Sequence, residues 1–176
     1  MHYIIEIKTN MSIKTQMNKE ILSPKKLDDI DLELLRLLQA NCNLTTKELA
    51  DKVHLSPTPV FERIRQLEAS GYILGYSALL NRKLLNHGFC VFCNIRLKKH
   101  SRNYIIHFKK AIKKIDEITE CYNISGDYDF MLKIYVTDME HYQDFVQNKL
   151  GTIESVGSLH SLFVLEEVKH LQGMNV

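Results

Sequence analysis

The chain has 176 residues, of which 45% are hydrophobic and 25% charged, and its formal net charge is +2 at pH 7. This length suits two small domains with packed cores. No run of the chain approaches the roughly 18 apolar residues that a membrane span requires. The weak net charge argues against a uniformly basic coat for nucleic acid, so any DNA affinity has to come from locally placed cations and from dimerisation.

The four cysteines indicate reduced thiols, because no secretory signal pattern accompanies them. We therefore expect a cytoplasmic protein. The Cys90-x-x-Cys93 pair lies in a segment with the composition of a strand. Residues three apart on a strand point to opposite faces, so these two thiols cannot share one metal ion. We predict no metal site, no cofactor and no catalytic residues.

Residues 1–24 are predicted to form an N-terminal tail or extension. Met11 and Met17 each provide an alternative start. We expect no function for this segment and no tight packing.

Residues 25–72 carry three successive helix starts, which together predict a helix-turn-helix domain. The capping signals are Asp28 with Asp31, Thr45 with Glu48, and Ser56 followed by Pro57. The first two are acid-containing caps, and the proline suits the first position of a helix. Because only a three-residue turn separates the second helix from the third, the third is positioned as a helix that enters the major groove of DNA.

The third helix has an apolar face and a polar face. At about 100° per residue, Val60, Ile64 and Leu67 point toward the other two helices. The opposite face offers side chains that hydrogen-bond to bases or phosphates, although an ordinary solvated helix shows a similar face. The predicted DNA-binding residues are Thr46, Ser56, Thr58, Pro59, Glu62, Arg63, Arg65 and Gln66.

Residues 73–86 are predicted to be a linker strand, and residues 87–170 a second domain, followed by a C-terminal tail at 171–176. In the second domain, strand-like and helix-like periods alternate in the order β-α-β-β-α-β. The expected strands are 89–97, 118–125, 130–136 and 156–168, and the second helix runs from a cap at Asp138 to Leu150. This order predicts a ferredoxin-like domain and an α+β chain.

A ferredoxin-like sheet has both helices on one face, so we expect its other face to be apolar and open. Pairing two such sheets about a two-fold axis would cover that face and bring two heads together. On the first helix of this domain, Lys109, Lys110, Lys113 and Lys114 form a basic strip. A solvated outer face and a nucleic-acid patch are both consistent with that strip.

Several separate motifs occur in a fixed order over about residues 26–170. The N-terminal motifs are Leu27-Asp-Asp-Ile-Asp31, Leu55-Ser-Pro-Thr-Pro59, Glu62-Arg-Ile-Arg-Gln-Leu-Glu68, Gly71-Tyr-Ile and Gly75-Tyr-Ser-Ala-Leu-Leu80. The C-terminal motifs are Glu120-Cys, Ser125-Gly-Asp-Tyr-Asp129 and Glu166-Glu-Val-Lys169. Together these motifs resemble the Lrp/AsnC (leucine-responsive regulatory protein) family. One departure is His54, where the family usually has glycine, and we expect a slightly strained turn there.

The resemblance implies an amino-acid effector bound near the turn before the third strand. Gly-Asp-x-Asp is also ordinary turn chemistry, but carboxylates suit an ammonium group and hydroxyls or turn amides suit a carboxylate. The implied effector-binding residues are Ser125, Gly126, Asp127, Tyr128, Asp129 and Thr137. We expect Thr137, at the end of the following strand, to lie close to the others.

The sequence thus predicts a sequence-specific DNA-binding transcriptional regulator whose assembly and DNA affinity respond to a small metabolite. The expected partners are double-stranded DNA, an amino acid and a second copy of the chain, with tetramers or octamers as further assemblies. Two alternatives stay open: an enzyme on the same scaffold, resembling sirohaem decarboxylases, and an assembly module that does not bind DNA. The eight histidines are scattered and form no catalytic spacing.

Overall fold

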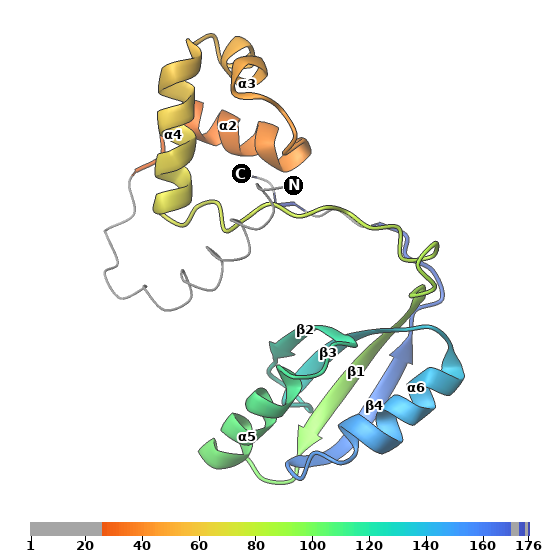
Figure 1. Cartoon of the computed structure of the whole chain (residues 1–176). Helices are drawn as coiled ribbons and strands as arrows, with labels where there is room; N and C mark the ends of the chain where they lie inside the picture. Colours follow the sequence, from red (N-terminus) through yellow and green to blue (C-terminus); the bar gives the residue numbers. More distant parts are fainter. Residues whose placement is uncertain (1–25, 170–172, 175) are drawn as a thin grey trace. The chain divides into compact units, whose positions relative to one another are not determined.

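The computed structural model describes residues 26–169, 173–174 and 176, and it divides into two compact units (Figure 1). The first unit contains the described residues up to Ala78 together with those near the C-terminus. The second begins at Leu79 and extends to the end of the described segment at 169. The predicted N-terminal tail, residues 1–24, lies outside the described residues.

Within the residues that the structure describes, the first unit contains three helices: α2 (Asp29–Ala40), α3 (Thr46–Lys52) and α4 (Pro57–Ala69). The predicted capping boxes of Asp28 with Asp31 and of Thr45 with Glu48 are confirmed, since in each pair both reciprocal hydrogen bonds form. The apolar faces meet in a core of buried residues, which are Leu34, Leu49, Ala50, Val60 and Leu67. Local capping signals and helical periodicity therefore produce this fold directly.

The turn between α3 and α4 is sharp. His54 has φ 56°, in the left-handed region, and the backbone N–H of Leu55 donates to Ala50 O at 3.0 Å. The expected strain at His54 is thus confirmed. Ser56 occupies the N-cap position of α4, but its side chain accepts no capping hydrogen bond. An N-cap side chain accepts from the second or third helical amide, and the third residue here is Pro59, which has no N–H.

The predicted linker strand at 73–86 is wrong for the single chain. Residues 73–80 have neither helical nor strand hydrogen bonding, and residues 82–86 form turns. A strand needs a neighbouring strand to receive its backbone hydrogen bonds, and none of the described segments pairs with this one. Leu74, Leu79 and Leu80 are exposed along it.

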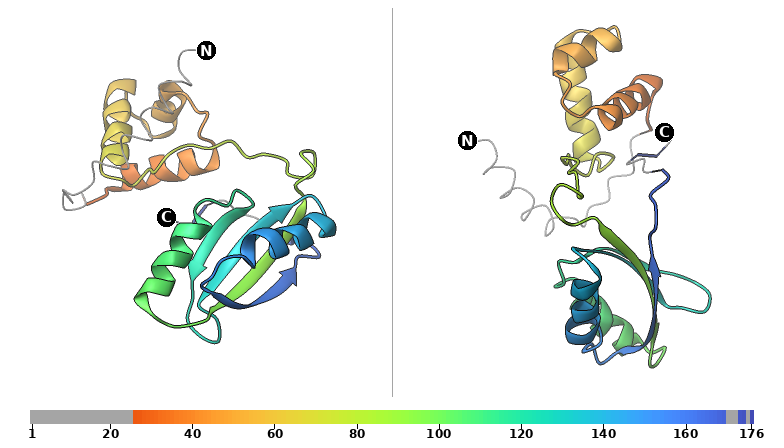
Figure 2. Two further views of the ribbon diagram at one scale, coloured as in Figure 1. Left: turned by 60° about the horizontal axis from the view of Figure 1, so that its bottom comes forward. Right: turned by 90° about the vertical axis from the view of Figure 1, so that its right-hand side faces the viewer.

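The second unit is an antiparallel sheet in the order β2-β3-β1-β4, covered by helices on one face (Figure 2). Its strands are β1 (Phe89–Leu97), β2 (Ile118–Asn123), β3 (Phe130–Val136) and β4 (Val156–Phe163). The helices are α5 (Arg102–Ile112) and α6 (Met139–Phe145), and α6 continues as a π-helical turn, η1 (Val146–Leu150). The predicted ferredoxin-like β-α-β-β-α-β order is confirmed.

The fourth strand is shorter than the predicted 156–168. It pairs with β1, in which Val91 faces Phe163, and the last ladder bond runs from Val164 N to Cys90 O at 3.1 Å. Because β1 begins at Phe89, residues 165–168 have no strand to pair with.

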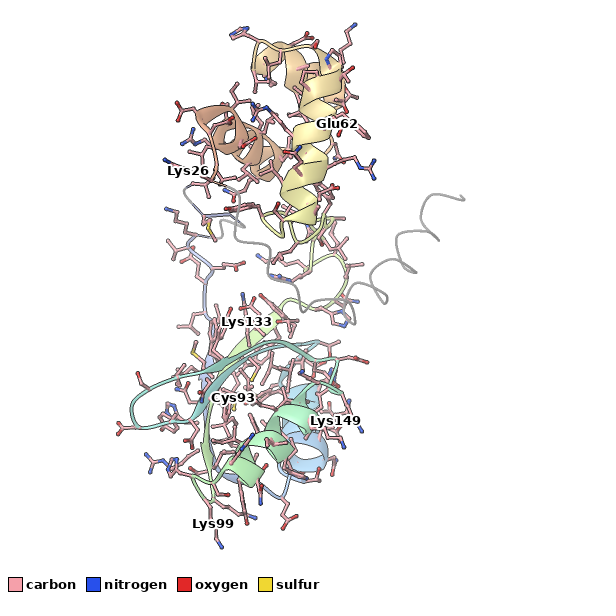
Figure 3. The ribbon with its side chains drawn as sticks, turned by 90° about the vertical axis from the view of Figure 1, so that its left-hand side faces the viewer. Lys26, Glu62, Cys93, Lys99, Lys133 and Lys149 are labelled. Carbon is pink, nitrogen blue, oxygen red and sulfur yellow. The ribbon has the colours of Figure 1, made fainter. Side chains whose placement is uncertain are left out.

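The sheet face opposite the helices is not uniformly apolar, which corrects the prediction. Glu120 accepts hydrogen bonds there from Tyr122 Oη at 2.6 Å and from Lys133 Nζ at 3.1 Å. The Lys133 ammonium also lies 5.9 Å from the centre of the Phe92 ring (Figure 3 labels Lys133). Strand alternation sends the core residues Val91, Cys93, Ile95 and Leu97 to the helices and leaves a mixed polar and aromatic face behind.

Candidate DNA-binding and effector sites

The outward face of α4 presents four of the side chains that were predicted to contact DNA. Thr58, Glu62, Arg65 and Gln66 are all exposed, whereas Val60 and Leu67 on the other face are buried (Glu62 is labelled in Figure 3). The Arg65 guanidinium lies 5.7 Å from the centre of the exposed Phe61 ring. This arrangement keeps a cation and hydrogen-bonding groups on the surface, which suits contacts with base edges and phosphates.

The first turn of α4 provides a second set of candidate contacts. Ser56, Thr58 and Pro59 are exposed there, and the Ser56 hydroxyl is not used for capping. The positive end of a helix and its unpaired amides attract phosphate. Thr46, the first residue of α3, is half-buried and contributes less surface than the other predicted residues.

Arg63 points into the unit and not outward. Its Nη1 donates to Asp31 Oδ1 and to Asp28 Oδ2, each at 2.7 Å. The Asp31 side chain is fully buried, and only a quarter of the Arg63 side chain is exposed. The hydrogen bonds to Asp31 and then to Asp28 raise the pKa of Arg63 above its ordinary value. Arg63 therefore joins α4 to the first turn of α2.

The loop between β2 and β3 is held in place by Asp129. Its backbone N–H donates to Ile95 O at 2.8 Å, and its carboxylate accepts from Leu97 N at 2.7 Å. The other carboxylate oxygen lies 2.8 Å from His100 Nδ1. Gly126 has φ 113°, a conformation that favours glycine. Asp129 is thus committed to fixing the loop.

Asp127 and Tyr128 lie beside two residues that the sequence analysis did not include. Arg96 Nε donates to the Asp127 carbonyl at 2.9 Å, and the Arg96 guanidinium lies 5.5 Å from the centre of the Tyr128 ring. The Tyr128 ring also stacks on His160, with centroids 6.1 Å apart. The Asp127 carboxylate makes no ion pair or hydrogen bond within the described part of the chain. Ser125 is exposed in the same loop.

Thr137 lies at the opposite end of β3 from this loop, contrary to the expectation that it would be close. The eight residues from Asp129 span roughly 25 Å of strand. Thr137 Oγ1 donates to Asp138 at 2.9 Å, and Asp138 caps α6 by accepting from His141 N at 2.8 Å. Thr137 lines a separate depression of about 650 Å³, together with Lys83, Asn86, Gly88, Phe89 and Asp138.

Neither metal-binding nor membrane-spanning features occur in the residues that the structure describes. No group of three or more His, Cys, Asp or Glu side chains is arranged to hold a metal ion in residues 26–169. Cys93 (labelled in Figure 3) is buried, and Cys90 is half-buried on the opposite face of β1. None of the described helices has both the length and the apolar character to cross a membrane.

Two family models match the chain, one in each unit. Residues 27–73 match a model described as winged helix-turn-helix DNA-binding. Residues 90–174 match a model described as the Lrp/AsnC ligand binding domain. The matches coincide with the three-helix unit and the ferredoxin-like unit.

Relatives and solved structures agree with these matches. The leucine-responsive regulatory proteins of Escherichia coli K12 and Klebsiella pneumoniae are each 40% identical over 145 residues, covering 82% of this chain and 88% of theirs. A Neisseria meningitidis transcriptional regulator in complex with L-Met is 33% identical, with TM-score 0.82 over 85% of this chain and 97% of that one. Escherichia coli AsnC is 27% identical, with TM-score 0.76 over 82% and 96% of the two chains. The chain therefore belongs to the Lrp/AsnC family of transcriptional regulators.

Proposed function

We propose that this protein is a sequence-specific DNA-binding transcriptional regulator whose assembly and DNA affinity respond to an amino acid. The observation that carries this proposal is the exposed polar face of α4, presented immediately after the fixed turn at His54. That face is compatible with insertion into the major groove, because most of its exposed side chains are polar and the apolar side of the helix is buried.

The DNA contacts divide by position along the helix. In this proposal Glu62, Arg65 and Gln66 read base edges, since arginine suits guanine, glutamine suits adenine and glutamate accepts from cytosine. Thr46, Ser56 and Thr58 are proposed to contact phosphates around the start of α4. Arg63 is removed from the predicted contact set, because its guanidinium is engaged by Asp28 and Asp31.

A homodimer is the smallest assembly that this function needs. One three-helix head reads few base pairs, whereas two heads related by a two-fold axis read an approximately palindromic site. Tyr122 and Leu162, each almost half exposed on the open sheet face, are apolar surface that a second copy would cover. Tetramers or octamers would follow from further contacts between dimers.

The amino acid is proposed to bind at the loop between β2 and β3. The Asp127 carboxylate is available for an ammonium group, while Ser125 and the turn amides at Gly126 suit a carboxylate. Tyr128, stacked on His160, would form a wall for the ligand's side chain. The Neisseria meningitidis relative, whose structure contains L-Met, supports an amino acid as the ligand class. Thr137 lies outside this site in the single chain.

Regulation then requires no catalysis. An amino acid that binds one assembly state more tightly than another shifts the population between them, and the DNA affinity shifts with it. We accordingly propose that the protein is not an enzyme and that it acts in the cytoplasm, where its DNA lies. The enzyme alternative predicts a haem-type Soret absorbance on the purified protein, which the proposed regulator lacks.

The test begins with selection of bound sequences from random duplexes, followed by fluorescence anisotropy with each amino acid present or absent. We expect a selected consensus with two-fold character, and at least one amino acid that changes its affinity. Arg65→Ala is expected to weaken specific binding, whereas Arg36→Ala, which removes the same charge from the exposed side of α2, is the matched control. Absence of any sequence preference at low salt contradicts the proposal and favours an assembly module.

A further inference from the structure

The segment around α5 has an unusual concentration of positive charge. Residues 98–115 contain seven of the chain's 23 lysines and arginines and no aspartate or glutamate, although the whole chain has a net charge of only +2. The seven are Lys98, Lys99, Arg102, Lys109, Lys110, Lys113 and Lys114. Figure 3 labels Lys99, at the start of this segment.

These cations are not neutralised by the unit that contains them. Within residues 26–169, the ion pairs of the second unit involve His100, Lys133, His141 and Lys149, and none of the seven. The Lys109 ammonium lies 5.9 Å from the centre of the Phe130 ring, which is a weak contact. The like charges at Lys109 and Lys113, one helical turn apart, repel each other.

The helix dipole explains only part of this concentration of positive charge. Lys109 and Lys110 lie in the last turn of α5, where cations favour the negative end of the helix. Arg102 is the first residue of α5, where the helix dipole disfavours a cation. Neither the fold nor the dipole accounts for a cation at that end.

The cations lie along one side of α5. At about 100° per residue, Arg102, Lys109 and Lys113 project within about 20° of one line, over about 16 Å of helix. Beside this line, Lys110 and Lys114 line a cleft of about 480 Å³ together with Lys149, His107 and Thr152. Lys149 is paired with Glu117, so Lys110 and Lys114 are the lysines of this lining without an ion pair in the described residues. We call Arg102, Lys109, Lys110, Lys113 and Lys114 the α5 strip.

We propose that the α5 strip binds the phosphate backbone of DNA that flanks the sequence read by the heads. This inference rests on the proposed function. A line of cations about 16 Å long matches several consecutive phosphates, since each strand rises 3.4 Å per base pair. A single small phosphate compound would fill the cleft but leave Arg102, Lys109 and Lys113 unmatched. A membrane surface fits poorly, because Ile106 is the one large exposed hydrophobic residue among the described residues of α5.

The strip contributes affinity without sequence preference. Each phosphate that a lysine neutralises releases a counterion, so the affinity falls with salt by a slope of about 0.9 per contact. Contacts of this kind bind any sequence equally and add to the specific contacts of α4.

The experiment compares two double variants on two duplexes carrying the selected sequence. Lys109→Gln with Lys113→Gln removes two charges from the α5 strip, and Lys83→Gln with Lys169→Gln removes two from exposed positions elsewhere in the same unit. One duplex ends at the selected site, and the other extends it with random flanking sequence. All three proteins are first compared by thermal melting, in which we expect no change because all four lysines are exposed.

On the long duplex, the strip variant is expected to lower the salt slope of binding by about 1.8, which corresponds to two lost phosphate contacts. On the short duplex its slope should equal that of the wild type, and the control variant should match the wild type on both. Equal slopes for the strip variant and wild type on the long duplex overturn the inference, as does an equal loss in the control.

Two further outcomes separate this inference from its premise. If the wild type fails to bind the short duplex specifically, the proposed function fails; if it binds and the long duplex shows no slope change, only the α5 strip inference fails. Calorimetry with tripolyphosphate provides the last arm. Saturable binding that the strip variant loses, without any change in the DNA salt slope, overturns the DNA assignment in favour of a soluble phosphate compound.

Discussion

Arg63 on α4 and the buried Asp31 on α2 form an ion pair in which Nη1 and Oδ1 are 2.7 Å apart. Asp31 also takes part in the capping box of its own helix. One carboxylate thereby links the start of α2 to the helix proposed to read DNA. The orientation of that helix depends on this pair as well as on the apolar core.

Replacing Arg63 and replacing Arg65 should have different consequences, although both remove one charge from α4. Arg63→Ala removes the guanidinium that donates to the fully buried Asp31 carboxylate, and we expect the head to lose about 1–3 kcal/mol of stability. Arg65→Ala should leave the free energy of unfolding within about 0.5 kcal/mol of the wild type, because Arg65 is exposed. Denaturant unfolding measures the first effect, and DNA anisotropy measures the loss of affinity in the second.

A second variant at the same position tests whether Arg63 has a structural role. Arg63→Lys keeps the charge but replaces the planar guanidinium, whose Nη1 donates to both Asp28 and Asp31, with an ammonium of different reach and geometry, so it should recover only part of the lost stability. If Arg63→Ala melts like the wild type and loses only DNA affinity, Arg63 is a DNA contact and its structural role is refuted.

His54→Gly should stabilise the turn that sets the angle between α3 and α4. The φ of 56° at His54 costs a side chain about 0.5–1 kcal/mol relative to glycine. We therefore expect a gain of that size in the free energy of unfolding, with DNA affinity unchanged or slightly raised. Gly71→Ala is the matched opposite: Gly71 has φ 76° with open space around it, so only backbone strain should lower its stability. A loss of stability in His54→Gly would show that the imidazole makes a contact that outweighs the strain.

Elements whose signals are local were the ones that the sequence predicted well. The capping boxes at Asp28 and Thr45 lie within four residues of the groups they bond, so their helices begin as expected. Strand β3 was predicted at its observed bounds because apolar residues fill it between two turns. The β-α-β-β-α-β order then followed from the alternation of periods.

What the sequence did not provide was the pairing between distant segments. Arg63 was predicted to contact DNA, but its partner Asp31 is 32 residues earlier and belongs to another helix. Thr137 was expected near Asp129 because the two are close in sequence. However, Asp129 precedes strand β3 and Thr137 follows it, so the full length of the strand separates them. Arg96 reaches the candidate effector loop through the β1–β3 pairing, and His160 reaches it through the β1–β4 pairing.

Gly151 follows the helical segment that was predicted to end at Leu150. Its φ of −68° is open to any residue, so backbone conformation does not require glycine there. A Cβ there would lie 2.7 Å from Val146 O, so the close approach of the backbone selects glycine.

The two aspartates of the β2–β3 loop should separate structure from ligand binding. Asp129→Asn weakens the bonds to Leu97 N and His100, so we expect a loss of about 1–2 kcal/mol in stability and a weaker amino-acid response. Asp127→Asn should leave stability unchanged within about 0.5 kcal/mol, because its carboxylate has no partner in the described chain. It should, however, abolish the rise in melting temperature that a bound amino acid produces.

Thermal melting with and without a saturating amino acid measures both effects in one experiment. Ser158→Ala, an exposed change on β4 outside the loop, serves as the control. An unaltered ligand shift in Asp127→Asn would remove this carboxylate from the proposed site.

The free energy of unfolding should fall at low pH because the Glu117 carboxylate in the second unit becomes protonated. Burial alone would raise the pKa of Glu117, but its hydrogen bond with Lys149, a backbone hydrogen bond and the nearby His141 ring outweigh that effect and hold the pKa below the ordinary value of 4.5. A carboxylate with a lowered pKa contributes stability above its unfolded pKa, and this is lost as pH falls through the folded value. Unfolding free energies measured from pH 7 to pH 3 should therefore decline below about pH 4.5.

Glu117→Gln identifies the source of that decline. At pH 7 the variant should be less stable than the wild type, because the ion pair with Lys149 is gone. Between pH 4.5 and pH 3 it should lose less stability than the wild type, since the glutamine has no proton to take up. Glu154→Gln, an exposed change for which the described residues offer no ion pair, should follow the wild-type curve. Parallel acid limbs for Glu117→Gln and the wild type would mean that other carboxylates carry the pH dependence.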